Sequence, residues 1–246
     1  MLDVSRQGPV AIVSLRRPER RNAMDQALVA ALTATLLKME TDSDVASIIL
    51  CGEPPGFCAG SDLKFIGRLS LEEMCRFEAE TGDAARLIGL LNKPVIAAVE
   101  GFALGAGFIL AASCDLVVSA TNARWHLPEV PIGWLTPWGL QALIGRTGAV
   151  SARRLCFATE PLDGEEAKRI GVVDHLAGPG RAIDAATALG NRLAALPRQA
   201  TGAVKRFFMP AVSGMSEVLD VRANAAFADN CKHPVARATL ERFGAR

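Results

Sequence analysis

Two short turns made of small residues could stabilise a negative charge on a bound ligand. The first lies in Phe57–Lys64, which reads Phe-Cys-Ala-Gly-Ser-Asp-Leu-Lys, and the second is Gly105-Ala-Gly107 at the start of an apolar stretch. Small residues let a backbone approach a ligand closely, and amide groups at the start of a helix are free to donate hydrogen bonds. Two such turns facing each other could form an oxyanion hole. Each pattern alone, however, is more typical of an ordinary tight turn.

Glu129 is a candidate acid or base. It follows Pro128 within Trp125–Gly133, a segment with almost no other charge. A carboxyl group among apolar and aromatic neighbours should have a raised pKa, which suits proton transfer near neutral pH. The competing interpretation is an exposed loop glutamate or a helix cap.

Other kinds of chemistry lack the residues they need. Neither glycine turn matches the dinucleotide-binding pattern or the P-loop, so no nucleotide cofactor is expected. The three histidines, His126, His175 and His233, are not spaced as a metal-binding pair, and no zinc or iron site is predicted. The six cysteines contain no Cys-x-x-Cys pair and are expected to be reduced and mostly buried.

Length and composition predict a globular protein. It has 246 residues, 50% of them apolar and 22% charged, which is enough to bury a large core. The net charge of +1 provides no general attraction for a nucleic acid or an anionic membrane. The longest uncharged apolar stretch, 101–114, is too short to span a bilayer, and residues 1–8 do not resemble a signal peptide. The expected location is the cytoplasm.

The elements that must hold these residues alternate between strand and helix. The expected strands are 10–15, 45–51, 94–99 and 115–118. Helices are expected after Asn22 as a cap, after the Ser70 and Glu73 capping box, and after Asp163. After about residue 180 the pattern is helical, so we predict an α/β core of residues 1–180 followed by a C-terminal helical region of residues 181–246.

Four motifs, in this order and spacing, resemble those of the crotonase superfamily, the enoyl-CoA hydratase/isomerase family. They are Arg17–Met24, Phe57–Lys64, Lys93–Gly107 running on to Cys114-Asp115, and Pro128-Glu129 followed by Ile132-Gly133. The resemblance implies a ClpP-like α/β spiral of strand-strand-helix units. It also implies that the C-terminal helices lie at the subunit interface of a homotrimer or of a hexamer built from two trimers. The implied ligand is an acyl-CoA thioester, in which CoA is part of the substrate and no separate cofactor is needed.

The resemblance also assigns roles to individual residues. The amides of Ser61 and Ala106 form the oxyanion hole for the thioester oxygen, and Glu129 is the acid or base. Further residues are implied to bind substrate: Ala59, Asp62, Leu63, Lys64, Arg21, Gly107, Ile109 and Trp138. One or more of Arg20, Arg21 and Lys64 are implied to bind the CoA phosphates, while Asp62 and Asp115 look structural.

Two departures from the family pattern bear on the reaction. Family hydratases carry a second glutamate where this chain has Ile109, and their glycine-rich turn is replaced here by Leu135–Leu140. Trp134 and Trp138 then either shape the acyl pocket or pack in the core.

The missing glutamate leads us to expect isomerisation. Hydration needs two carboxylates to hold a water, deprotonate it and protonate C2, whereas one base can move a proton from C2 to C4 of a 3-enoyl-CoA. The leading expectation is therefore a Δ3-to-Δ2 enoyl-CoA isomerase with Glu129 as the proton shuttle. Alternatives are a 2-enoyl-CoA hydratase, decarboxylation or hydrolysis of another acyl-CoA, and a non-catalytic acyl-CoA binder. A serine hydrolase on a related spiral fold is disfavoured because no Gly-x-Ser-x-Gly elbow is present.

Overall fold

A six-stranded sheet forms the centre of the molecule in a computed structural model that describes residues 1–157 and 160–244. Its strands, in spatial order, are β1 (Leu2–Gln7), β2 (Val10–Leu15), β3 (Ser47–Gly52), β4 (Val95–Val99), β6 (Leu116–Ala120) and β8 (His175–Ala177). Only β1 pairs antiparallel, and the others run parallel. All residues of β3 and β4 are buried, as expected for parallel strands that are covered on both faces.

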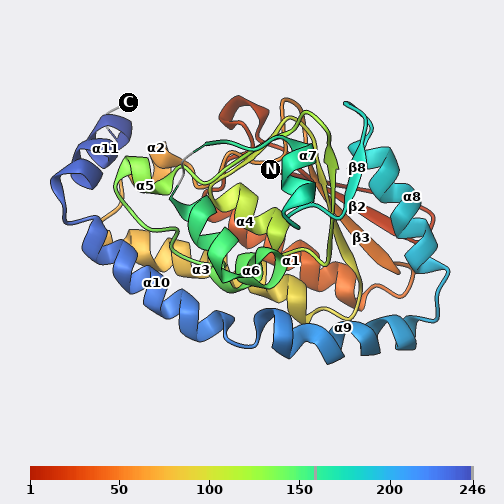
Figure 1. The fold of residues 1–246 in the computed structure, drawn as a ribbon. Coiled ribbons are helices and arrows are strands. Elements are labelled where there is room, and N and C mark those ends of the chain that lie inside the picture. The colour runs from red at the N-terminus through yellow and green to blue at the C-terminus, as the bar shows by residue number, and fades with distance from the viewer. Residues whose placement is uncertain (158–159, 245–246) are drawn as a thin grey trace.

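Two apolar layers cover the sheet. Alternate residues of a strand point to opposite faces, so Ile48 and Leu50 of β3 join the main core, which includes α1 (Gln26–Thr41) and α3 (Leu71–Leu90). Ile49 joins a second cluster with α8 (Ala182–Ala194), which lies against β3, β4 and β6. The first helix after the predicted boundary at residue 180 thus packs on the central sheet (Figure 1).

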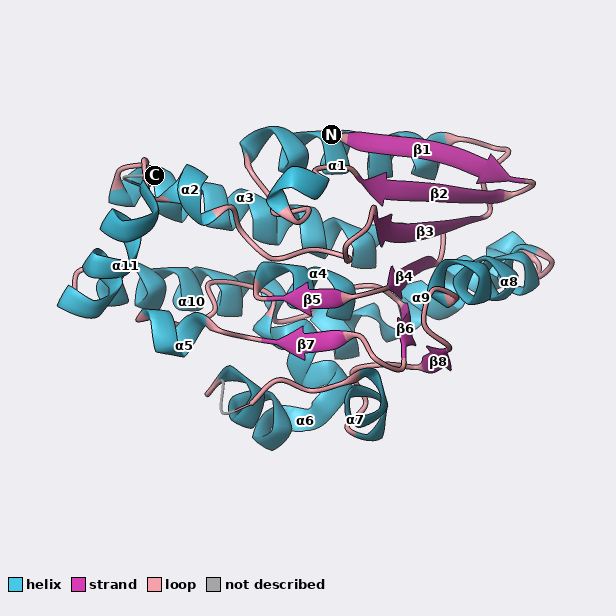
Figure 2. Cartoon of the chain, turned by 90° about the horizontal axis from the view of Figure 1, so that it is seen from above, coloured by secondary structure: helices cyan, strands magenta, loops and turns pink. Residues whose placement is uncertain are grey.

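A second, two-stranded sheet positions the candidate chemistry. Its strands β5 (Phe102–Leu104) and β7 (Arg124–His126) are parallel and lie side by side (Figure 2). Helix α4 (Ala106–Ala112) begins just beyond β5, and the short helix α5 (Glu129–Ile132) begins just beyond β7. Because the carboxyl ends of parallel strands meet at one edge, the second glycine turn and Glu129 are brought together.

The remaining helices wrap this core. They are the 3-10 helix η1 (Pro18–Arg20), α2 (Leu63–Ile66), α6 (Leu140–Cys156), α7 (Gly164–Arg169), α9 (Arg198–Ser213), α10 (Ser216–Asn230) and α11 (Pro234–Gly244). Helices α9 and α10 run along one side of the molecule, and α10 packs on α3 (Figure 1). Helix α11 packs against α2 and α5. Within the described residues, no helix is both long and apolar enough to cross a membrane.

The predicted helix starts are partly right. The capping box of Ser70 and Glu73 is confirmed at the start of α3, and Asp163 caps α7 as expected. The assignment of Asn22 as a cap is wrong, because Asp25 accepts the bond from the Leu28 amide at the start of α1.

Asn22 instead ties two loops together. It is fully buried, and its side-chain amide donates to the carbonyl oxygens of Glu53 (2.6 Å) and Gly56 (2.8 Å). Its side-chain oxygen accepts from the amide of Arg17 at 2.9 Å. Both ends of this side chain are thus directed to other loops rather than to the first turn of α1, and no local sequence pattern reveals the two carbonyl partners more than 30 positions away.

Candidate active site

The two glycine turns pack directly against each other. Gly60 has φ of 98°, and a Cβ placed there would lie 3.2 Å from the Ala106 nitrogen and 3.0 Å from the Leu104 carbonyl oxygen. A Cβ on Gly107 would lie 2.3 Å from the Cys58 carbonyl oxygen. Only glycine at these positions allows such an approach, so the small residues serve a close contact between the two turns.

Two backbone amides are unused at this contact. Met24 binds both neighbours of Ser61, donating to the Gly60 oxygen at 2.8 Å and accepting from the Asp62 amide at 2.7 Å. Ala106 is the first residue of α4 and has no carbonyl one turn before it to bind. Among residues 1–157 and 160–244, no hydrogen bond uses the amide of Ser61 or Ala106. The turns therefore offer two donors where a thioester oxygen would need them.

Glu129 lies against the second turn. The Gly105 amide donates to His126 of β7 at 2.9 Å, and a Cβ on Gly105 would lie 3.0 Å from Oε1 of Glu129. The predicted burial is confirmed, since Glu129 is only 6% exposed. Its Oε2 has no hydrogen-bond partner within the described residues.

This environment favours the neutral form of Glu129. Burial away from water, reinforced by the negative charge of Glu78, raises the pKa of Glu129 to about 8, against a weaker opposing backbone hydrogen bond. The protonated form of this carboxyl group is therefore favoured near neutral pH. A neutral carboxylic acid beside two free amide donors can deliver a proton to a carbon atom next to a carbonyl group.

A second buried carboxylate, Glu78 of α3, was not predicted. It is 3% exposed, and its Oε1 accepts from the Ser61 hydroxyl at 2.7 Å. Its Oε2 accepts from Nε1 of Trp138 at 2.8 Å. Burial raises the pKa of Glu78, while the two hydrogen bonds act in the opposite direction. The site thus holds two carboxyl groups that come from different helices.

The sequence did contain a signal for Glu78. The buried residues of α3 recur at helical spacing and include Met74, Phe77, Glu78, Thr81 and Ile88. A glutamate on the apolar face of an amphipathic helix must find hydrogen-bond partners, and so marks a structural or functional site.

These groups enclose a cavity of about 70 Å³. Its lining residues come from both turns, α2, α3, α5 and the loop before α6: Ala59, Gly60, Ser61, Leu63, Ile66, Glu78, Gly105, Ala106, Pro128, Glu129, Ile132, Trp134, Thr136, Pro137 and Trp138. Both tryptophans line it and are also core residues, since Trp134 stacks edge-on against Phe227 of α10 with ring centres 5.7 Å apart. The two interpretations of these tryptophans are therefore compatible.

Several of the predicted substrate-binding residues do not line this cavity. Asp62 caps α2 and forms an ion pair with Arg17 at 3.1 Å. Lys64 is half-buried on α2, and Arg21 is exposed with its guanidinium 4.6 Å from the centre of the Phe102 ring. None of these three is a lining residue, whereas Ala59 and Leu63 are.

Ile109 also lies outside the cavity lining. It is fully buried, and a Cβ on Gly139 would lie 2.1 Å from its Cγ2. Ile109 therefore packs against the start of α6, and it is Glu78 rather than position 109 that provides the second carboxyl group of the cavity.

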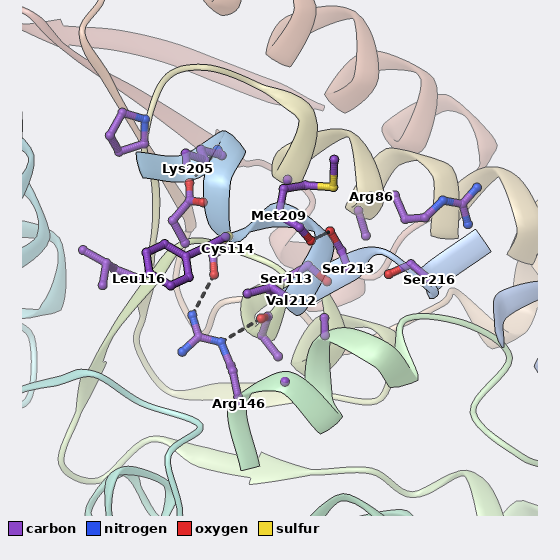
Figure 3. A pocket seen from close by; sticks show the side chains of 18 of the residues that line it. Arg86, Ser113, Cys114, Leu116, Arg146, Lys205, Met209, Val212, Ser213 and Ser216 are labelled. Atoms are coloured by element: carbon purple, nitrogen blue, oxygen red, sulfur yellow. Dashed lines mark hydrogen bonds and ion pairs between the residues drawn. The ribbon is translucent and has the colours of Figure 1, made fainter. Parts of the chain in front are cut away.

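A larger cavity of about 530 Å³ lies elsewhere, beneath α9. Figure 3 shows Arg146 reaching the backbone there, where it donates to the carbonyl oxygens of Cys114 (2.7 Å) and Ala112 (2.8 Å). The two cavities share no lining residue. We therefore place the candidate chemistry in the smaller cavity, where both carboxylates lie.

Comparisons with known sequences agree with the motifs. A family model described as Enoyl-CoA hydratase/isomerase matches residues 5–242. The Short-chain-enoyl-CoA hydratase of Clostridium acetobutylicum is 34% identical over 193 residues, 77% of this chain and 74% of that protein. The 2,3-dehydroadipyl-CoA hydratase of Escherichia coli is 34% identical over 194 residues, 78% of this chain and 75% of that protein.

Solved structures share the fold over nearly the whole chain. An enoyl-CoA hydratase/isomerase from Mycobacterium paratuberculosis superposes with a TM-score of 0.89 at 21% identity, covering 98% of this chain and 97% of the other. An enoyl-CoA hydratase from a Polaromonas species has a TM-score of 0.82 at 28% identity, covering 94% and 92%. The predicted α/β crotonase fold is confirmed.

Proposed function

Because the chain belongs to the enoyl-CoA hydratase/isomerase family, we propose that this enzyme adds water across the double bond of a 2-enoyl-CoA. The observation that carries the proposal is the buried Glu129 carboxyl group, which lines the same cavity as the two free amides and whose raised pKa favours the protonated form. Hydration needs an acid that protonates C2, whereas isomerisation of a 3-enoyl-CoA begins with a base that removes a proton from C2.

The expectation of isomerisation rested on Ile109 leaving a single carboxylate in the site. Glu78 removes that ground, because it lines the same cavity as Glu129. The relatives named above carry hydratase names, which supports the same choice. Isomerisation remains the second candidate, because Glu129 alone suffices for it once ionised.

In the proposed reaction the thioester oxygen accepts hydrogen bonds from the amides of Ser61 and Ala106. These donors stabilise the negative charge that develops on that oxygen as water adds to C3, and each aligned donor contributes about 3 kcal/mol in the transition state. Glu129 then delivers its proton to C2. Trp134 and Ile132, which also line the cavity, keep bulk water away from the reacting carbons.

The test is a substrate panel of 2-enoyl-, 3-enoyl- and malonyl-type CoA esters with purified enzyme. We expect rapid hydration of a 2-enoyl-CoA. Glu129→Gln should lower its kcat by about a hundred- to ten-thousand-fold and leave the binding of acetoacetyl-CoA, an enolate mimic, nearly unchanged. Conversion of 3-enoyl-CoA without hydration of 2-enoyl-CoA would favour the isomerase, and failure to bind acetoacetyl-CoA would reject an acyl-CoA function.

The CoA phosphates need cations at the mouth of the site. Arg20, Arg21 and Lys64 are the proposed partners. Arg20 and Arg21 lie at η1, in the segment 17–24, and Lys64 lies in α2, just after the first turn. Single alanine variants should raise KM for acyl-CoA with little change in kcat, because contacts to a remote part of the substrate act equally in the ground and transition states.

The proposed assembly is a homotrimer or a hexamer. Helices α9 and α10 expose large apolar side chains: Val204, Phe207, Phe208, Val212, Val218 and Val221. Such a surface favours burial between subunits, and a closed ring buries it equally in every copy. Light scattering that finds a stable monomer at micromolar concentration would contradict this assembly.

A further inference from the structure

Glu78 stands out among the buried titratable groups because the family motifs do not account for it. It lies in the interior of α3, one helical turn after Met74, and it is nearly as inaccessible as its apolar neighbours. Burying a carboxylate is unfavourable unless its oxygens are hydrogen-bonded. Here both oxygens have partners, the Ser61 hydroxyl and the Trp138 indole, and both partners line the cavity.

The two carboxyl groups differ in their hydrogen bonding. Burial raises the pKa of Glu78, but it accepts a hydrogen bond at each oxygen, and these two bonds oppose that rise by stabilising the ionised form. Glu129 has an Oε2 without a partner in the described chain, and the charge of Glu78 opposes its ionisation. Of two carboxyl groups in one cavity, the one whose oxygens both accept hydrogen bonds suits a base, and the one with an oxygen unpaired in the described residues suits an acid.

The two departures from the family pattern are linked through Glu78. Ile109 leaves α4 without a carboxylate, and the segment Leu135–Leu140 brings the Trp138 indole to α3. The indole can sit there because position 82 is glycine, where a Cβ would lie 2.9 Å from the Cβ of Trp138. The cavity thus lacks a carboxylate from α4 but has one from α3, and Trp138 of the altered segment donates a hydrogen bond to it.

We infer that Glu78 is the second catalytic carboxylate of this site, the base that holds the attacking water and takes its proton. The inference rests on the proposed hydration. As the water oxygen bonds to C3, one water proton passes to Glu78 and the π electrons move into the thioester enolate. The enolate carbon C2 then takes the proton of Glu129. One water has been added, and a proton returns from Glu78 to Glu129 before the next turnover.

The rival interpretation is that Glu78 only positions the first turn through the Ser61 hydroxyl. The two interpretations differ for a reaction that uses the hole and Glu129 but no attacking water. Exchange of the C2 protons of butyryl-CoA with D₂O is such a reaction. It is monitored by NMR at a pH above the pKa of Glu129, where Glu129 is ionised and can remove the C2 proton. A misplaced Ser61 amide would slow this exchange as much as it slows hydration, whereas loss of the water-activating base would not.

The decisive variant is therefore Glu78→Gln, assayed for both reactions. We expect hydration of a 2-enoyl-CoA to fall at least about a hundredfold, with C2 exchange within a few-fold of wild type. Glu129→Gln should lose both reactions. A melting curve and acetoacetyl-CoA binding establish that each variant is folded. Ser61→Ala, which deletes only the hydroxyl contact, is the comparison for a positioning role.

Trp138→Phe provides a second test that leaves the carboxylate in place. It removes one donor to Glu78 and so disfavours the ionised form. The acid limb of the hydration pH profile, which reports ionisation of Glu78, should therefore move to higher pH. The alkaline limb, which reports Glu129, should stay near its wild-type position.

Three results would overturn the inference. Glu78→Gln could hydrate at the wild-type rate, or it could lose hydration and exchange equally and match Ser61→Ala, or Trp138→Phe could leave the acid limb unmoved. In each case wild-type hydration still supports the proposed function. A wild type that exchanges C2 protons but hydrates no 2-enoyl-CoA would instead reject both the proposed function and the role of Glu78.

Discussion

Gly60→Ala should separate the two turns that form the candidate oxyanion hole. The new Cβ would lie 3.0 Å from the Leu104 carbonyl oxygen and 3.2 Å from the Ala106 nitrogen. Both neighbours are backbone atoms, which cannot rotate away as a flexible side chain can. The turns must therefore move apart by a few tenths of an ångström, and the displaced atoms include one of the two proposed donors.

Two effects of this substitution have different magnitudes. Residue 60 has φ of 98°, and an alanine held in that region costs about 1–3 kcal/mol of stability. Loss of one aligned oxyanion donor costs about a hundred- to a thousandfold in kcat. We therefore expect an enzyme that is moderately destabilised but still folded. Its kcat should fall far more than the small increase in unfolded enzyme could explain.

A matched control separates strain from displacement. Gly180 has φ of 77°, and a Cβ there would meet no atom within 4 Å. Gly180→Ala should thus show the loss of stability alone, with kcat near wild type. The assays are urea unfolding and steady-state hydration of a 2-enoyl-CoA. If Gly60→Ala retains wild-type kcat while its stability falls as in Gly180→Ala, these turns do not form the hole.

Three further outcomes follow from the buried groups and the exposed helices. Folding raises the pKa of Glu129, so the contribution of this group to stability is present below the unfolded pKa of 4.5 and is lost as the pH rises through about 8. The free energy of unfolding of wild type relative to Glu129→Gln, measured with urea, should therefore fall over that pH range. A constant difference would show that this carboxyl group is not held neutral. Ile109→Glu should lower the melting temperature strongly, because it buries a carboxyl group against Gly139, and it should not speed hydration, because position 109 does not line the cavity. A stable variant with faster hydration would show that position 109 does reach the substrate. Phe207→Glu, at a side chain 78% exposed on α9, should shift the assembly towards monomers in light scattering, and an unchanged particle mass would place the subunit interface elsewhere.

The local part of the site could be predicted because it depends on residues close together in sequence. The small residues at 59–61 and 105–107 are visible as short local patterns, and the Ser70 and Glu73 capping box forms within one helical turn. The burial of Glu129 followed from the apolar run around it. These predictions needed no knowledge of distant contacts.

The role of Asn22 could not be predicted in this way. Asparagine before an apolar helical repeat is typical of a cap, and the sequence offers no reason to prefer a contact with residues 53 and 56. Strand β1 was also missed, because most of its residues are exposed and it lacks the apolar alternation that marks a half-buried strand.

By itself the sequence determined the fold family, the two glycine turns and the buried carboxyl group of Glu129. Tertiary structure alone decided which second carboxylate shares the cavity, because Glu78 and Trp138 are 60 positions apart and meet only when α3 packs beside the loop that precedes α6. A sequence pattern compares residues position by position along the chain, where position 109 has isoleucine instead of an acid. The folded chain compares positions in space, where a side chain from another helix can bring the same chemical group to the same cavity.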